Sequence, residues 1–238
     1  MLPRVLIIVP TLGRRVRYLR ETLASITAQD VPIDLVVVTP VDAHEARDLA
    51  TEFGAGIIAD PGSLPKAINA GASALQPHHE FVNWLGDDDL LEPGSIRSTI
   101  SMLDGDPRAV LAYGACRYID ADGRQLWISQ AGRWAPRILK WGPDLIPQPG
   151  MLVRASAWQE VGGVDESFSM AFDLDLLLKL QRVGQLRDTG TIVSSFRWHG
   201  DSLTAGDRSR NLDESEQAKR RYLSPNASRM KWLWERPV

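Results

Sequence analysis

The sequence has a single cysteine, no long apolar run and no excess of charge of one sign, and each absence excludes a class of protein. Cys116 cannot form an intrachain disulfide, so an oxidising compartment is not required. No run approaches the ~20 apolar residues of a membrane-spanning helix. Lys and Arg number 27 against 30 Asp and Glu, and the net charge of −3 provides no global field for nucleic acid. A nucleic acid partner is therefore not expected.

What is present is the composition of an ordinary globular domain. The 238 residues are 44% hydrophobic and 24% charged, which argues against a disordered, coiled-coil or fibrous protein. The apolar run 5–9 is too short for a signal peptide, and the charged cluster 14–17 follows it instead of preceding it. We therefore expect a cytoplasmic protein.

The first half of the chain alternates short β-rich runs with helical patterns. Strands are expected at 5–9, 35–38, 56–59 and 81–85, and helices at 18–28, 43–53, 67–75 and 95–103. Continuous apolar runs such as 5–9 are typical of strands buried on both faces of a parallel sheet. The alternation predicts an α/β fold, with a mostly parallel sheet flanked by helices.

The regular alternation of strands and helices ends after Leu111. Strands are expected at 110–115, 117–119, 125–128, 148–154 and 191–198, and a helix at 174–183. Residues 130–147 lack periodicity, which predicts an irregular loop rich in aromatic residues. From Arg208 onward the chain becomes rich in Lys and Arg, which indicates a C-terminal helical tail.

Three adjacent carboxylates, Asp87, Asp88 and Asp89, come directly after the expected buried strand 81–85. In open α/β sheets, ligands bind outside the carboxyl ends of the strands. Adjacent carboxylates repel one another unless a cation neutralises them, and oxygen ligands suit Mg²⁺ or Mn²⁺ bridging to phosphates. The triplet therefore indicates a Mn²⁺ or Mg²⁺ site. The alternative is a solvated acidic turn before the next helix.

Two further segments carry candidate chemistry. On a helix, positions two apart point about 200° away from each other, so Asp173 and Asp175 cannot both face one site. One of them near the helix start suits a general base, with an ordinary helix N-cap as the alternative for Asp173. His199 follows a strand, and its imidazole suits a carboxylate-bound cation, the alternative being a surface or packing residue.

Several segments in this order together resemble the family-two glycosyltransferases, which have the GT-A fold. They are residues 5–11, 66–71, 85–94, 148–154, 161–167, 171–176 and 197–202. The resemblance implies a GT-A domain over 1–205, in which about 1–105 bind the nucleotide sugar and 106–205 form the acceptor side. Residues 206–238 are then a basic and aromatic tail.

The resemblance also implies roles for individual residues. Asp173 falls on the position of the catalytic base. The metal ligands implied are Asp88, Asp89 and His199. The nucleotide-sugar contacts implied are Pro10, Thr11, Asp42, Lys66, Asn69, Asp87 and Asp88. Acceptor contacts are expected from Trp134, Trp141 and Gln148, with packing of the loop and of the following strand as the alternative.

The implied function is the metal-dependent transfer of a sugar, with inversion, from a nucleoside-diphosphate sugar to a hydroxyl of a glycan or lipid-linked acceptor. Gly86 and the segment 39–42 depart from the family pattern, and the alternative of a non-catalytic nucleotide-sugar or glycan-binding protein rests on these departures. A sugar-phosphate nucleotidyltransferase would need a Gly-rich basic loop after the first strand, and 11–15 is a poor version of one.

The tail offers two kinds of partner. Its basic run 219–222, with Trp232 and Trp234, suits an anionic membrane surface at the inner face of the membrane. The alternative is a helix that packs on its own domain or on a second copy of the chain in a homodimer.

Overall fold

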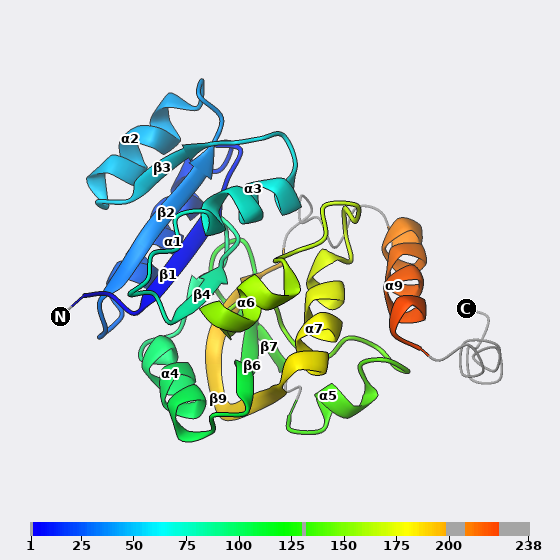
Figure 1. Cartoon of the computed structure of the whole chain (residues 1–238). Helices are drawn as coiled ribbons and strands as arrows, with labels where there is room; N and C mark the ends of the chain where they lie inside the picture. The colour runs from blue at the N-terminus through cyan, green and yellow to red at the C-terminus, as the bar shows by residue number, and fades with distance from the viewer. Residues whose placement is uncertain (1, 130–131, 199–207, 224–238) are drawn as a thin grey trace.

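The computed structural model describes residues 2–129, 132–198 and 208–223 (Figure 1). Within these residues the strands form one nine-stranded sheet in the order β3-β2-β1-β4-β8-β6-β9-β5, with β7 paired to β6. The strands are β1 (Val5–Pro10), β2 (Ile33–Thr39), β3 (Gly56–Ala59), β4 (Phe81–Trp84), β5 (Leu90–Leu91), β6 (Ala109–Ile119), β7 (Gln125–Ser129), β8 (Leu152–Arg154) and β9 (Gln185–Arg197). The helices are α1 (Val16–Thr27), α2 (His44–Glu52), α3 (Leu64–Ala72), α4 (Ser95–Gly105), α5 (Ala135–Ile138), α6 (Ala155–Val161), α7 (Phe172–Val183) and α9 (Arg208–Tyr222).

The first half of the sheet is parallel, as the sequence predicts. β1 lies between β2 and β4, and all three run in the same direction as β3. Every residue of β1 is buried, because helices cover both faces. Beyond β4 the sheet is mixed, since β8 is antiparallel to β4 and β6 while β6 and β9 are parallel. The carboxyl ends of β1, β2 and β4 therefore share one edge.

Two apolar cores lie on opposite faces of the sheet. One packs α1, α2 and α4 against it, through residues such as Leu23, Leu49 and Ile96. The other packs α3, α6 and α7, through residues such as Ile68 and Leu177. This helix cover on both faces confirms the expected α/β class.

Several local expectations differ from the structure. The strand expected at 191–198 begins six residues earlier, at Gln185, as β9. The strands expected at 110–115 and 117–119 are one strand, β6, whose pairing with β9 shifts register on either side of Ala115. The strand expected at 148–154 is only β8, because Gly150 has a φ of +79°, which extended backbone does not allow. Helix α3 begins at Leu64 with Pro65 in its first turn, three residues before the expected start.

The C-terminal helix α9, orange in Figure 1, lies beside α7. Ala218 is fully buried in this contact, and the hydroxyl of Tyr222 donates a 2.9 Å hydrogen bond to Oδ1 of Asp175 on α7. Lys219 is also buried, and Arg221 forms an ion pair with Asp165. The basic run thus turns two of its cations toward its own domain.

Trp232 and Trp234 lie outside the described residues, so membrane contact and a homodimer stay predictions. Among the helices that the structure describes, none combines the length and the apolar character needed to cross a bilayer.

Candidate functional site

The acidic turn 87–89 lies at the carboxyl edge of the sheet, where β4 ends beside β1. Thr11, directly after β1, donates a 2.5 Å hydrogen bond from Oγ1 to Oδ2 of Asp87. Arg15 comes from the loop before α1. Its guanidinium forms ion pairs of 3.0 Å with Asp87 and 2.6 Å with Asp88. Arg15 was not expected at the site, although it belongs to the charged cluster 14–17.

The third carboxylate of the turn is held from the other half of the chain. Oδ1 of Asp89 accepts a 3.1 Å hydrogen bond from the backbone N–H of Arg197, at the end of β9. Asp89 is 4% exposed. Burial, and next the charge of Asp88, raise the pKa of Asp89 well above its usual range. The turn therefore brings three carboxyl groups together in a place from which water is largely excluded, and this disfavours the charged form of Asp89.

Gly86 stands in the position where the family usually has an acidic or amide residue. A Cβ at this position would lie 2.9 Å from Oδ2 of Asp89 and 3.1 Å from Oδ1 of Asp88. A side chain here would therefore displace the two carboxylates, and glycine allows both to fold back over the turn. Gly86 leaves Asp88 and Asp89 as the candidate acidic ligands.

The donor set of the turn fits a hard divalent cation. It consists of carboxylate oxygens, and the Asp88 side chain keeps 14% of its surface exposed. The fixed positive charge of Arg15 already neutralises part of the turn, as a cation would. The third expected ligand, His199, lies outside the described residues.

The remaining donor-side residues are placed at or near the same edge. Pro10 ends β1 and is buried, whereas Asp42 is exposed in the turn after β2. Lys66 is exposed in the first turn of α3. The amide of Asn69 binds the backbone of Val164 on both its polar atoms, at 2.9 and 3.1 Å, so it joins α3 to the loop before α7. Contact of these residues with a nucleotide sugar stays a prediction.

Asp173 lies in the first turn of α7, and its environment differs from that of Asp175. The N-cap of α7 is Ala171, so Asp173 is not the ordinary cap weighed from the sequence. Oδ1 of Asp173 accepts a 2.8 Å hydrogen bond from the N–H of Leu174. Asp175 is fully buried between Tyr222 and Lys179, so its role is structural.

A second carboxyl, Asp144, accompanies Asp173 and was not expected. Solvent reaches both groups, since Asp144 is exposed and Asp173 half-buried. The surrounding protein nevertheless desolvates them and raises the pKa of Asp173 to about 6. Desolvation, and next the charge of Asp173, raise the pKa of Asp144 to about 7. Two carboxyls that titrate near neutrality are the arrangement that acid–base chemistry requires.

The expected acceptor residues lie in the half of the chain that also contains Asp173. Trp134 is 57% exposed at the start of α5, with the guanidinium of Arg137 4.1 Å from its ring centroid, and Trp141 is 43% exposed. Nε2 of Gln148 donates a 2.8 Å hydrogen bond to the carbonyl of Trp84, the last residue of β4. Gln148 therefore holds the loop at the end of this strand. A role in acceptor binding stays a prediction for all three.

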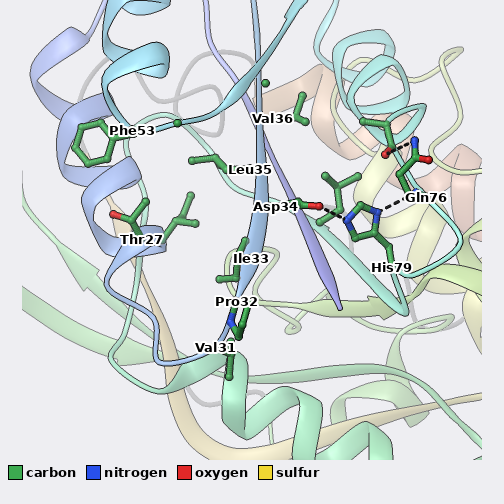
Figure 2. Close-up of a pocket in the computed structure, with 15 residues that line it drawn as sticks. Thr27, Val31, Pro32, Ile33, Asp34, Leu35, Val36, Phe53, Gln76 and His79 are labelled. Carbon is green, nitrogen blue, oxygen red and sulfur yellow. Dashed lines mark hydrogen bonds and ion pairs between the residues drawn. The ribbon is translucent and has the colours of Figure 1, made fainter. Parts of the chain in front are cut away.

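Another group with metal-ligand chemistry lies at the opposite end of the strands. Asp34, His78 and His79 offer ligand atoms within 4.8 Å of one another. Asp34 and His79 line a cavity of about 500 Å³ at the amino ends of β1 and β2 (Figure 2). Asp34 pairs with Leu6, which in turn pairs with Val82. Asp87 comes five positions after Val82, which corresponds to roughly 17 Å of extended chain at 3.3 Å per residue.

Hydrogen bonds give this second group a structural role. Nδ1 of His79 accepts the N–H of Gln76 at 2.9 Å, and its Nε2 is 2.8 Å from Oδ2 of Asp34 (Figure 2). Because Nδ1 accepts, the ring proton is on Nε2 and is donated to Asp34. A metal on Nε2 would have to displace this proton. The group therefore does not substitute for the acidic turn.

Comparison with solved structures identifies the fold. TarS from S. aureus (residues 1–349) superposes with a TM-score of 0.67 at 15% identity, over 96% of this chain and 69% of TarS. The mannosyltransferase PcManGT from Pyrobaculum calidifontis, in complex with GDP-Man and Mn²⁺, gives 0.70 at 16% identity, over 98% of this chain and 69% of that protein. The chain has the GT-A fold. The fold class expected from the sequence is confirmed.

Two sequence relatives of the chain are named glycosyltransferases, and a third is named for O-antigen biosynthesis. An uncharacterized glycosyltransferase of Rickettsia felis is 27% identical over 84% of this chain and 35% of the relative. A second, from Rickettsia typhi, is 26% identical over 90% of this chain and 70% of the relative. The O-antigen biosynthesis protein RfbC of Myxococcus xanthus is 28% identical over 95% of this chain and 18% of RfbC.

No family model matches the chain. The chain spans about a third of the Rickettsia felis relative and less than a fifth of RfbC. The names of the two Rickettsia relatives agree with the family resemblance that the motif order indicated.

Proposed function

We propose that this GT-A chain transfers a sugar from a nucleoside-diphosphate sugar to a hydroxyl acceptor, with the help of a divalent cation and with inversion at the anomeric carbon. The observation that carries the proposal is the acidic turn 87–89 at the carboxyl edge of the parallel half-sheet. This edge is where open α/β sheets bind ligands.

The donor side would be formed by the loops after β1, β2 and β4. TarS has been solved with UDP-GlcNAc and PcManGT with GDP-Man and Mn²⁺, which supports a nucleotide-sugar donor for this chain. Asp88, Asp89 and His199 would hold Mn²⁺ or Mg²⁺, which stabilises the negative charge of a leaving diphosphate. Thr11 orients Asp87 and, with Arg15, keeps the turn in place.

The acceptor side would be formed around Asp173. A hydroxyl is a poor nucleophile, and a positioned carboxylate that accepts its proton contributes about 10²–10⁴-fold. The acceptor oxygen forms the new bond to the anomeric carbon while the bond to the diphosphate oxygen breaks. The diphosphate leaves with the electron pair, and the proton goes to Asp173. Attack opposite the leaving group inverts the centre. Trp134 and Trp141 offer exposed faces to a glycan.

A thermal-shift screen tests the donor class. UDP-, GDP- and TDP-sugars are added to the purified chain with and without Mn²⁺. A ligand at a hundredfold excess over its Kd stabilises the folded state by about 2.7 kcal/mol, which is readily detected. Stabilisation by one base class, enhanced by Mn²⁺, is expected. A chain that no nucleotide sugar stabilises contradicts the proposal.

Hydrolysis of the bound donor distinguishes an enzyme from a binding protein. Water competes with the acceptor hydroxyl in such sites, so slow release of free sugar is expected from the chain with its donor. Binding without any hydrolysis supports the alternative of a non-catalytic nucleotide-sugar-binding protein. Release of pyrophosphate from a nucleoside triphosphate and a sugar phosphate supports the nucleotidyltransferase alternative.

A further inference from the structure

The segment that leads into α7 is held by a residue of the C-terminal helix. The N-cap residue of α7, Ala171, has no side chain that can accept a backbone amide. Glu214 on α9 instead binds the three residues that end at this N-cap. Its Oε2 accepts the N–H groups of Ser169 at 2.8 Å, Met170 at 2.7 Å and Ala171 at 3.2 Å. Its Oε1 accepts the hydroxyl of Ser169 at 2.6 Å.

The Glu214 carboxylate is held in its ionised form. Burial alone would raise the pKa of Glu214, but the hydrogen bonds from Ser169, Met170 and Ala171 outweigh it and lower that pKa to about 2. Arg210, one turn earlier on α9, holds Oε1 from the other side at 3.1 Å. A full negative charge therefore lies at the positive end of the α7 dipole, where it is most stabilising.

Helix α9 is attached to this part of the molecule at its other end as well. The Tyr222 hydroxyl binds Asp175, and Arg221 forms an ion pair of 2.5 Å with Asp165 in the loop before α7. The Arg221 guanidinium also lies 4.3 Å from the ring centroid of Phe168. The loop 165–171 is thus held by α9 at two places.

These contacts act on the residue proposed as the base. Asp173 lies two positions after Ala171, and its carboxylate is oriented through the N–H of Leu174 in the same turn. We propose that Glu214 is a positioning residue for Asp173, so that α9 belongs to the catalytic apparatus and is more than an appended tail. This inference rests on the proposed function, in which Asp173 accepts the acceptor proton.

The test compares Glu214→Gln with Asp213→Asn in the full chain. Both variants remove one carboxylate from α9, but Asp213 is exposed. Hydrogen–deuterium exchange is measured over the peptide 165–176, and kcat and KM are measured for hydrolysis of the donor found by thermal shift. Glu214→Gln is expected to speed exchange at 169–171 and to lower kcat by about 10- to 100-fold, the cost of a misplaced reacting group. KM for the donor should stay within about twofold, because the donor site is not touched.

Asp213→Asn should match the unsubstituted chain in both measurements. If Glu214→Gln leaves exchange and kcat unchanged, or if Asp213→Asn lowers kcat equally, the proposal is overturned. Should Glu214→Gln fail to fold, Ser169→Ala removes one hydrogen bond to the same carboxylate and is expected to cause a smaller change of the same kind.

The proposed function and the positioning role of Glu214 can fail separately. If the unsubstituted chain hydrolyses no nucleotide sugar, the proposed function is wrong, and positioning of a base is wrong with it, even if exchange shows that Glu214 holds residues 169–171. If the chain hydrolyses its donor and Glu214→Gln speeds exchange while kcat stays unchanged, only the positioning role is overturned.

Discussion

The guanidinium of Arg197 and the carboxylate of Glu21 lie 2.6 Å apart, although 176 positions separate them in the sequence. Arg197 is 1% exposed. Its Nε donates to the carbonyl of Asp88 and its Nη1 to the carbonyl of Ala121, both at 3.1 Å. One buried cation thus joins α1, the acidic turn and the turn between β6 and β7.

Removal of this cation should destabilise the whole chain. Arg197→Ala removes the buried one of the two arginines paired with Glu21, and it removes a donor from the carbonyls of Asp88 and Ala121. Breaking a buried ion pair costs about 3–5 kcal/mol, and because Glu21 is 37% exposed we expect a loss at the lower end of that range. The free energy of unfolding in urea measures the loss. Arg124→Ala is the control, since Arg124 is 80% exposed and should change stability by about 0.5 kcal/mol at most. Equal stability of the two variants would contradict the anchoring role of Arg197.

Asp173→Asn should stop sugar transfer and leave donor binding intact. Loss of the base should cost about 10²–10⁴-fold in kcat, with the donor's thermal shift retained. Turnover equal to that of the unsubstituted chain would remove Asp173 from the role of base. The measurement is kcat for donor hydrolysis beside the melting temperature with donor.

The same substitution should stabilise the chain above neutral pH. The folded pKa of Asp173, about 6, exceeds its ordinary value of 3.8, so the folded state binds the proton more tightly. Stability contributed by this group is therefore present below about pH 4 and is lost as pH rises to 6. Asp173→Asn lacks this loss. It should be more stable at pH 8 by about 1–2 kcal/mol, discounted for partial exposure, and equal at pH 3. Urea unfolding at pH 3 and pH 8 measures the difference in unfolding free energy between the variant and the unsubstituted chain, and it tests whether the variant is the more stable at pH 8.

The pH dependence of donor hydrolysis should have an acidic limb between about pH 6 and 7. The base must be ionised, and Asp173 and Asp144 have pKa values of about 6 and about 7. Because their charges interact, the limb reports the pair. In the Asp144→Asn variant, the acidic limb of the pH profile should follow a single ionisation, that of Asp173. Hydrolysis that is constant from pH 5 to 8 would exclude this pair as the titrating groups.

Arg15 should compete with a divalent cation for the acidic turn. Arg15→Gln removes a positive charge that pairs with Asp87 and Asp88, so it should tighten Mn²⁺ binding about five- to tenfold at low salt. Calorimetry with Mn²⁺ alone measures this. Arg17→Gln, which removes an exposed charge, should change little, and Asp88→Asn should weaken Mn²⁺ binding.

Chelation gives a second measure of the metal proposal. EDTA should abolish donor hydrolysis, and added Mn²⁺ should restore it. Activity that survives EDTA undiminished would contradict a metal role for the turn 87–89.

Much of the parallel half of the fold was predictable because its signals are local. Residues 56–59 form β3 as expected, and β1, β2, β4, α1 and α2 differ from expectation by two residues or fewer at each end. The second half was harder. The break expected within β6 is a register shift at Ala115, which depends on the pairing with β9. Helix α6 was not expected, and the strand expected at 148–151 is a turn.

By itself, the sequence determined that a triplet of carboxylates follows a buried strand and that Asp173 and Asp175 face different ways, because both follow from backbone periodicity. Only the tertiary structure decided what those carboxylates meet. Arg15 reaches Asp87 from 72 positions away, and Glu214 reaches Ala171 from 43. Pairings of this kind depend on where separate elements come to lie when apolar faces are buried, and no local pattern records that.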